Sequence, residues 1–587
     1  MRSRWLSILW FALLLSAAAV MAAPMRPAHG AHGMVASQHE LASRAGVDIM
    51  QAGGNAVDAA IATGFALAVV HPQAGNLGGG GFLLLRTANG ETHFVDFREK
   101  APAAATASMY VDETGKPVAG ASTVGYKSIG VPGSVAGLVY AQKHWGKLTL
   151  ARVMAPAIKL ARRGWALSYE DARDFQDPAL GQFAESRRIF QRDGNFYKPG
   201  EIFRQPELAR TLQRIAKNPA DFYQGRMARQ IAAFMQRGGG LITAADLASY
   251  EVKEREAVRG AYRGLEIISA PPPSSGGVAL IEALNILEGY DLAKLGNRSA
   301  DSIHLVTEAF RRAFYDRAEF MGDPDFAKIP VAELIDKKYG VAWRESIDAQ
   351  RPTASAELRR PAEFRSLDRL AEAMGSTLTV QPPREPEHTT HYSVVDAEGA
   401  AVAVTTTLND GFGSKVTVEG LGFLLNDEMD DFASGPGIPN MFGLIQGAAN
   451  YVGANKRPLS AMTPTIVLKD GKLFLVLGSP GGPRIITAVA DMLLSVADWG
   501  LDIQQAVNAP RFHHQWLPDR LDVEEDGFSP DTIRLLESHG YKVQLGYESG
   551  GKHRRWWSDG ECIAVDPKTG ERLGASDARN NGRAIGY

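Results

Sequence analysis

Between residues 389 and 408, apolar and polar positions alternate in two runs separated by a short turn, which predicts a β-hairpin. The apolar positions fall on one face: Tyr392, Val394, Val402, Val404 and Leu408. Small and polar positions fall on the other face: Thr389, Ser393, Ala401, Thr405 and Thr407. Asp396 and Gly399 suit a three-residue loop that ends in a left-handed glycine, and this loop sets Thr389 opposite Thr407. Although β-branching alone makes threonine common in strands, we expect the two hydroxyls to be cross-strand neighbours.

Apolar periodicity predicts further elements on both sides of this hairpin. Helices are expected over residues 41–50 and 131–172. Strands are expected over residues 82–86 and 92–97. A later hairpin runs into a glycine turn and then a helix with an apolar stripe: Ile485, Ile486, Val489, Met492, Leu493 and Val496.

The composition of the chain is that of a globular protein, because 45% of its 587 residues are hydrophobic and 22% are charged. A net charge of -3 gives no electrostatic footprint for nucleic acid or an anionic membrane surface. Residues 351–388 are rich in Pro, Glu, Arg and Ala, a composition that favours a mobile segment over a packed one.

The first 23 residues have the plan of a secretory signal peptide, with basic residues, an apolar run and then small residues. The alternative is a membrane anchor, but the apolar run is short for a bilayer span. Export would place the mature protein in an oxidising compartment, the periplasm. Because Cys562 is the only cysteine, the chain cannot form an intramolecular disulfide.

Two glycine-rich stretches are candidates for close backbone approach. The run at residues 75–82 lacks the Lys-Ser/Thr pair of a phosphate loop, so we expect it to allow a tight contact that leads into a strand. The turn at residues 478–483 lies between a strand and a helix, where free N–H groups and the helix dipole can stabilise an oxyanion. A plain strand-to-helix turn is the alternative.

The segment Thr389-Thr390-His391-Tyr392-Ser393 resembles the start of the small subunit of γ-glutamyltranspeptidases, a family of N-terminal-nucleophile hydrolases. The resemblance implies that the precursor cuts itself between His388 and Thr389. Residues 24–388 would then form a large subunit and residues 389–587 a small one, together a heterodimer. The family implies an αββα sandwich, in which two stacked sheets are covered by helices.

The resemblance also assigns roles to particular residues. Thr389 would be the nucleophile, and Thr407, opposite it in the predicted register, would orient its hydroxyl. Arg98 and Ser460 would hold the α-carboxylate of a γ-glutamyl donor. The α-ammonium would be held by Asn409, Glu428 and Asp431. The oxyanion hole would be formed by Gly481 and Gly482.

The chain departs from the family pattern at two positions. Phe442, in the expected lid loop, replaces a tyrosine, and Ala461 replaces the second of two adjacent serines. The acidic cluster at residues 427–431 has the wrong spacing for a calcium loop, and His513-His514 lacks a third metal ligand. We expect no metal and no cofactor.

The reaction implied is cleavage of γ-glutamyl amides such as glutathione, with transfer of the γ-glutamyl group to water, an amino acid or a peptide. One rival is a β-lactam (glutaryl-cephalosporin) acylase of the same superfamily, which would not need to bind an α-ammonium. The other is a periplasmic amino-acid-binding protein, which would not cleave itself.

Overall fold

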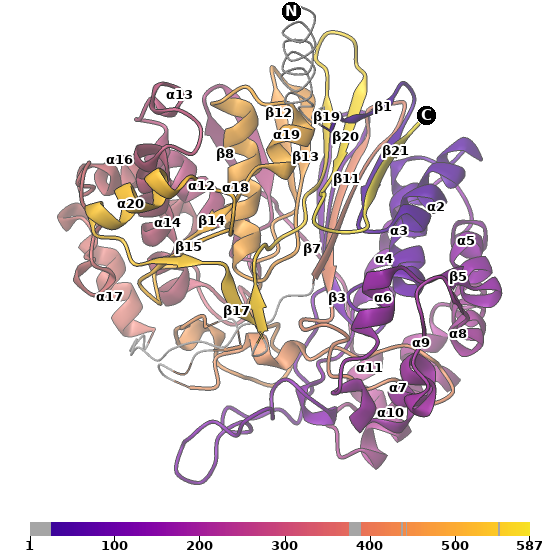
Figure 1. Ribbon diagram of the computed structural model, residues 1–587. Helices are drawn as coiled ribbons and strands as arrows, with labels where there is room; N and C mark the ends of the chain where they lie inside the picture. The colour runs from indigo at the N-terminus through magenta and orange to yellow at the C-terminus, as the bar shows by residue number, and fades with distance from the viewer. Residues whose placement is uncertain (1–24, 375–388, 436–437, 439, 442, 550–551) are drawn as a thin grey trace, which may run out of the picture.

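The computed structural model describes residues 25–374, 389–435, 438, 440–441, 443–549 and 552–587. Two seven-stranded sheets stack face to face at its centre (Figure 1). In order across the first sheet, the strands are β1 (Ala28–Gly30), β20 (Arg572–Ser576), β19 (Glu561–Val565), β13 (Lys472–Leu477), β12 (Thr465–Lys469), β9 (Leu265–Ser269) and β8 (Val258–Tyr262). In the second they are β21 (Arg583–Gly586), β2 (Met34–Ser37), β10 (Thr389–Val395), β11 (Ala401–Thr407), β3 (Gly80–Arg86), β4 (Thr92–Asp96) and β7 (Lys253–Arg255).

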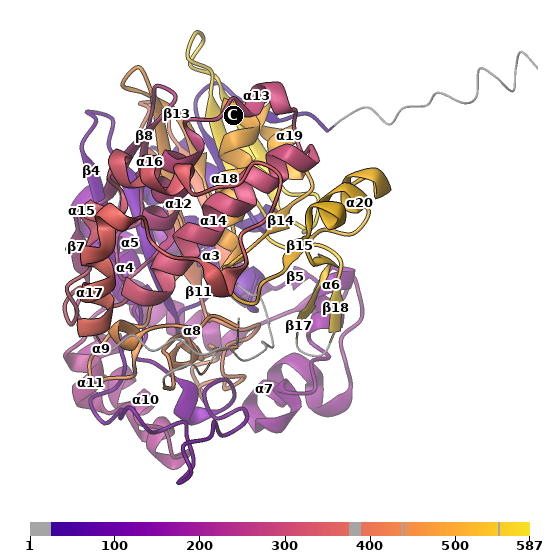
Figure 2. The ribbon, with the colours of Figure 1, turned by 90° about the vertical axis from the view of Figure 1, so that its left-hand side faces the viewer.

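Helices cover the outer face of each sheet. The first sheet is covered by α12 (Gly276–Leu287), α14 (Ala300–Phe320) and α18 (Arg484–Ala497), which lie across the front in Figure 2. The second is covered by α2 (Glu40–Gln51), α3 (Ala56–Val70), α4 (Ser134–Trp145) and α5 (Leu150–Arg163). This is the αββα sandwich expected from the sequence, and the prediction is confirmed. No helix in the described ranges is long and apolar enough to cross a bilayer.

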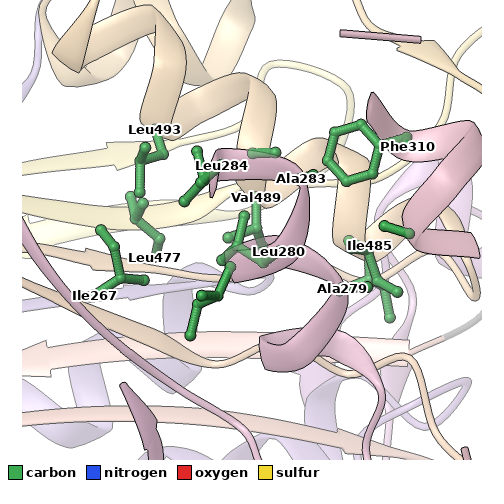
Figure 3. Packing of buried hydrophobic residues seen from close by; sticks show 14 of the residues in the cluster. Ile267, Ala279, Leu280, Ala283, Leu284, Phe310, Leu477, Ile485, Val489 and Leu493 are labelled. Atoms are coloured by element: carbon green, nitrogen blue, oxygen red, sulfur yellow. The ribbon is translucent and has the colours of Figure 1, made fainter. Parts of the chain in front are cut away.

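The core beneath α12 and α18 explains why these helices are apolar on nearly every face. Leu280 and Leu284 of α12 lie against Ile485 and Val489 of α18, above the sheet residue Leu477 (Figure 3). Each side chain is almost fully buried. Burial of a leucine or isoleucine contributes about 1.5–3 kcal/mol, so this layer fixes the position of the α18 N-terminus, which borders the site described below.

The central hairpin has the register predicted from its loop. Thr389 pairs with Thr407, Val395 pairs with Ala401, and Gly399 has a φ of 83°. Because β10 and β11 lie inside the second sheet and both faces are covered, every residue of both strands is buried. The polar face of the hairpin therefore points towards the other sheet.

The glycine run allows the close backbone contact that was expected. A Cβ atom on Gly79 would lie 2.0 Å from the carbonyl oxygen of Thr407, and one on Gly81 would lie 2.3 Å from that of Thr405. The main chain of β3 thus fits directly against the strand that carries Thr407.

The prediction that residues 351–388 form a mobile segment is wrong for the part that the structure describes. Residues 365–373 form helix α17 (Arg365–Ala373), and its Leu367 and Ala371 are buried. Arg360 is fully buried and forms ion pairs with Asp316 of α14 and with Asp368. The charged composition reflects buried ion pairs as well as solvent exposure. Residues 375–388 lie outside the described ranges.

Candidate active site

Thr389 is the first residue of β10, and its Oγ1 lies 3.2 Å from the Oγ1 of Thr407 on β11. Thr407 Oγ1 also accepts a hydrogen bond of 2.8 Å from the backbone N–H of Asn409. Because this N–H can only donate, the hydrogen of the Thr407 hydroxyl can point towards Thr389. Asn409 has a φ of 81°, a left-handed conformation that asparagine tolerates better than most residues and that turns the chain away from the strand.

His391, on the same face of β10, is too firmly engaged to serve as the base for Thr389. Its Nδ1 lies 2.8 Å from Thr405 Oγ1 and its Nε2 lies 3.1 Å from Ser393 Oγ. Burial lowers the pKa of His391 to about 3, so the ring is neutral at physiological pH. A Cβ on Gly478 would lie 2.1 Å from the ring, and this glycine therefore lets the loop before α18 pack directly on it.

A small buried cavity opens beside the Thr389 hydroxyl. Its lining includes all but one of the predicted site residues: Arg98, Thr389, Thr407, Asn409, Glu428, Asp431, Ser460 and Gly482. The exception is Gly481, which lines a larger adjacent cavity that Thr389 also borders. The fold thus brings together residues from the segment after β4, from the β10–β11 hairpin and the turn that follows it, and from three later segments.

Three charged residues of the small cavity, Arg98, Glu428 and Asp431, are paired with one another. The Arg98 guanidinium donates one hydrogen bond to Glu428 and one to Asp431. It also donates to the carbonyl oxygens of Pro458, at 3.2 Å, and Leu459, at 2.9 Å. Burial raises the pKa of the Glu428 carboxyl, and the adjacent guanidinium opposes that rise. The two carboxylates in turn hold the pKa of Arg98 above its usual value, which keeps the guanidinium charged despite its burial.

Asn426 positions the carboxylates. Its side-chain amide donates to the carbonyl oxygens of Gly78, at 2.7 Å, and Gly130, at 2.8 Å. Its Oδ1 accepts a hydrogen bond of 3.0 Å from the Glu428 N–H. The acidic turn Glu428–Asp431 is therefore anchored to the glycine run, and all of it but Asp431 is buried.

The glycine turn lies at the N-terminal end of α18, on the other side of Thr389. Gly481 has a φ of 128° and Gly482 a φ of 54°, and a Cβ on Gly481 would lie 2.3 Å from Ser558 Oγ. Only glycine adopts this backbone path without strain. The turn places two successive peptide N–H groups near the positive end of the helix dipole, an arrangement that can stabilise negative charge.

The larger cavity, of about 470 Å³, connects Thr389 to the surface. Its walls come from α6 (Tyr169–Asp174), from the hairpin of β17 (Tyr547–Ser549) and β18 (Lys552–Arg554), and from Trp557 and Ser558. Thr389 thus lies between a small charged cavity and a wider open one. A substrate whose reacting bond lies at the Thr389 hydroxyl could occupy both cavities.

Sequence reasoning missed Arg317, which also lines the small cavity. It lies on α14, where the neighbouring Arg311 and Arg312 both form ion pairs with Glu308. Nothing in helical spacing separates Arg317 from these neighbours. Other expectations fall on residues outside the described ranges: Phe442 of the lid loop, His388 at the cleavage site and the signal peptide.

Comparison with known proteins shows which proteins this chain is similar to. The profile of the family described as Gamma-glutamyltranspeptidase matches residues 42–587. A glutathione hydrolase proenzyme of Escherichia coli (strain K12) is 48% identical over 558 residues, which cover 94% of this chain and 91% of the relative. A glutathione hydrolase proenzyme of Pseudomonas sp. (strain A14) is 46% identical over 578 residues, with 97% and 96% covered. The crystal structure of a cephalosporin acylase from Bacillus halodurans is similar with a TM-score of 0.81 at 26% identity, covering 97% of this chain and 98% of that one. The family match, together with the high identity over nearly the whole length, establishes that this chain belongs to the γ-glutamyltranspeptidase family.

Proposed function

We propose that the protein is a γ-glutamyltransferase and glutathione hydrolase that uses Thr389 as its nucleophile. The observation that carries the proposal is the position of the Thr389 hydroxyl, 3.2 Å from Thr407 and at the mouth of a buried cavity that holds charges of both signs. A γ-glutamyl group carries an α-ammonium and an α-carboxylate, so a cavity with carboxylates and a guanidinium matches both.

The nucleophile is generated by self-cleavage. Thr389 Oγ1 attacks the carbonyl carbon of residue 388, and an N-to-O acyl shift breaks the peptide bond and forms an ester. Water then hydrolyses the ester, which leaves a carboxylate on residue 388 and a free α-amino group on Thr389. The products are a large subunit of residues 24–388 and a small subunit of residues 389–587, which remain together as a heterodimer because β10 and β11 lie inside a sheet shared by both.

The α-amino group of Thr389 is the base for the second reaction. Such a group has a reference pKa of about 7.7–8.0, so a useful fraction is neutral near pH 7 and can accept the hydroxyl proton. Thr407 orients the hydroxyl, and the N–H groups of Gly481 and Gly482 stabilise the oxyanion. The amine leaves with a proton, the γ-glutamyl group remains as an ester on Thr389, and water or an amino acid then takes it.

Donor binding exchanges one set of ion pairs for another. Arg98 is bound to Glu428 and Asp431. An entering donor presents its carboxylate to Arg98 and Ser460, and its ammonium to the two carboxylates and Asn409. Because every charge keeps a partner of opposite sign, the substrate can bind without leaving a buried charge unpaired.

The two rival functions fit the cavity less well. A glutaryl-cephalosporin acylase would bind a side chain that has a carboxylate and no ammonium. Glu428 and Asp431 would then have no substrate cation to bind. An amino-acid-binding protein would need the charges but would have no use for the paired threonine hydroxyls. The apolar run and small residues within the first 23 residues support export to the periplasm.

One assay tests the proposal. The purified protein should consume glutathione and L-γ-glutamyl-p-nitroanilide, and glycylglycine should accelerate release of p-nitroaniline by accepting the γ-glutamyl group. It should hydrolyse glutaryl-p-nitroanilide much more slowly. Faster hydrolysis of the glutaryl substrate would favour the acylase, and binding of glutamate by a protein without turnover would favour a solute-binding role.

A further inference from the structure

Arg317 is a buried cation whose guanidinium lies at the wall of the small cavity. Only 2% of the residue is exposed, and no carboxylate lies within 4.0 Å of it in the described part of the chain. Its Nη1 is buried and has no hydrogen-bond partner among the described residues. Asp431 acts on it electrostatically, but the Oδ2 of that carboxylate is bound to Arg98.

An arginine in this state is costly to the folded protein. Removing a guanidinium from water without a paired anion carries a desolvation penalty, and burial lowers the pKa of Arg317 to about 10. The other buried arginines of α14 avoid that penalty, because Arg311 and Arg312 both pair with Glu308. The difference marks Arg317 as a cation that can take an anionic group from a substrate.

Ser275 determines the direction in which Arg317 points. The Ser275 hydroxyl accepts a hydrogen bond of 2.8 Å from Arg317 Nε and donates one of 2.7 Å to the carbonyl oxygen of Ser460. This connection ties the guanidinium to the segment that carries Ser460 and Ala461, both of which line the cavity. Ser275 belongs to the Pro-rich stretch that leads into α12.

The charges of the cavity are consistent with a second cation for the substrate carboxylate. When the ammonium of a donor takes over Glu428 and Asp431, Arg98 is left with the α-carboxylate. Glu99, whose pKa burial raises to about 7, adds at most part of another negative charge beside Arg98. The site then holds two guanidinium groups, two carboxylates and one zwitterion, so its net charge is close to zero. These groups are those of Arg98, Arg317, Glu428 and Asp431.

We infer that Arg317 is a specificity-determining residue that binds the α-carboxylate of the γ-glutamyl donor together with Arg98 and Ser460. It stands on the side where Ala461 lacks a hydroxyl, and a guanidinium there supplies the donor that the alanine does not. This inference rests on the proposed γ-glutamyl transfer and adds to it the residue that recognises one group of the substrate.

The test compares two substrates that differ only in the α-carboxylate, L-γ-glutamyl-p-nitroanilide and 4-aminobutyryl-p-nitroanilide. Arg317→Gln should raise KM for the first by roughly 10- to 100-fold, the range for a lost hydrogen bond to a charged group, and should leave KM for the second within about twofold. The ratio of the two kcat/KM values should therefore fall by the same factor. Inhibition constants for L-glutamate and 4-aminobutyrate give this ratio independently of turnover.

Matched variants separate recognition from a structural role. Arg312→Gln removes an equally buried arginine of the same helix and should leave the substrate ratio unchanged, even if it lowers Tm. Ala461→Ser in the Arg317→Gln background should recover part of the lost affinity for the γ-glutamyl substrate. If Arg317→Gln is not processed into two chains, Arg317→Lys is measured in its place. This variant keeps the charge and should lower the ratio of the two kcat/KM values by roughly 3- to 10-fold.

Equal losses on both substrates in the Arg317 variants would overturn the inference, because they would mean that the arginine only supports the fold. An unchanged ratio in Arg317→Lys would overturn it as well. Failure of the proposed function looks different, since the parent protein would then not hydrolyse L-γ-glutamyl-p-nitroanilide at all.

Discussion

The Oγ1 atoms of Thr389 and Thr407 lie 3.2 Å apart across adjacent strands, as the loop between those strands predicted. Two further contacts hold Thr407 in place. Thr407 also binds the N–H of Asn409, and its carbonyl oxygen is so close to Gly79 that no larger residue fits there. The sheet thus fixes the geometry of the hydroxyl before any substrate arrives, which is the kind of preorganisation that nucleophilic catalysis needs.

Thr389→Ala should yield one inactive chain, because neither self-cleavage nor acyl transfer can occur without the hydroxyl. The parent should give two chains, of which the shorter begins Thr389-Thr390-His391. Thr390→Ala is a matched control, since the adjacent Thr390 hydroxyl is buried without a hydrogen-bond partner among the described residues. Gel electrophoresis and N-terminal sequencing measure both. An active parent that remained a single chain would contradict the mechanism.

Thr407→Val should slow both self-cleavage and turnover. The substitution keeps the shape of the side chain and removes the hydroxyl that orients Thr389. We expect roughly tenfold slower processing and a similar fall in kcat, the size of one hydrogen bond that strengthens in the transition state. Time courses of precursor conversion and steady-state kinetics provide the measurements. If the variant kept both parental rates, the 3.2 Å contact would have no catalytic meaning.

Ala461→Ser should lower KM for glutathione by up to about tenfold and leave kcat nearly unchanged. The new hydroxyl would lie beside Ser460, whose Oγ accepts a hydrogen bond of 3.1 Å from the Met462 N–H and keeps its own hydrogen for the substrate. The α-carboxylate is distant from the bond that breaks, so the contact stabilises ground state and transition state alike. Ser460→Ala should have the opposite effect on KM. A change confined to kcat would show that this wall of the cavity contacts the reacting group.

Acid should destabilise the protein in part through His391. Burial lowers its pKa in the folded protein to about 3, whereas an unfolded histidine has a pKa of about 6.5. The unfolded chain therefore binds more protons as pH falls below 6.5, and the stabilisation that is fully present above that pH is progressively lost. Between pH 7 and pH 5 this histidine alone should cost about 2 kcal/mol.

Urea unfolding at pH 7 and pH 5 measures this loss, in the single-chain Thr389→Ala background so that subunit dissociation does not contribute. Replacing His391 with Asn in that background should reduce the loss between the two pH values by about 2 kcal/mol. Burial also lowers the pKa of His39 and of His514, each to about 4, so part of the acid sensitivity should remain. The same loss with and without His391 would contradict the assignment.

Local pattern was sufficient for the parts of the molecule in which neighbours in sequence are neighbours in space. The alternation of side chains and the three-residue loop determined the register of β10 and β11, and hence the pairing of Thr389 with Thr407. The turn before α18 and the apolar stripe of that helix were predicted for the same reason, since each is set by residues close together in the sequence. The family resemblance then indicated which of these residues line one cavity.

Tertiary structure decided what composition could not. Arg360 lies in a charged, Pro-rich segment that by composition alone should be mobile, yet it is buried because Asp316, on a distant helix, neutralises it. Nothing in the sequence distinguishes Arg317 from the other arginines of α14. Its hydrogen bond to Ser275 and its position in the cavity wall depend on the tertiary structure. The sequence by itself determined the pairing of Thr389 with Thr407. The burial and pairing of the charges around them depend on long-range contacts, because the free energy of a buried charge is set by the groups that surround it in space.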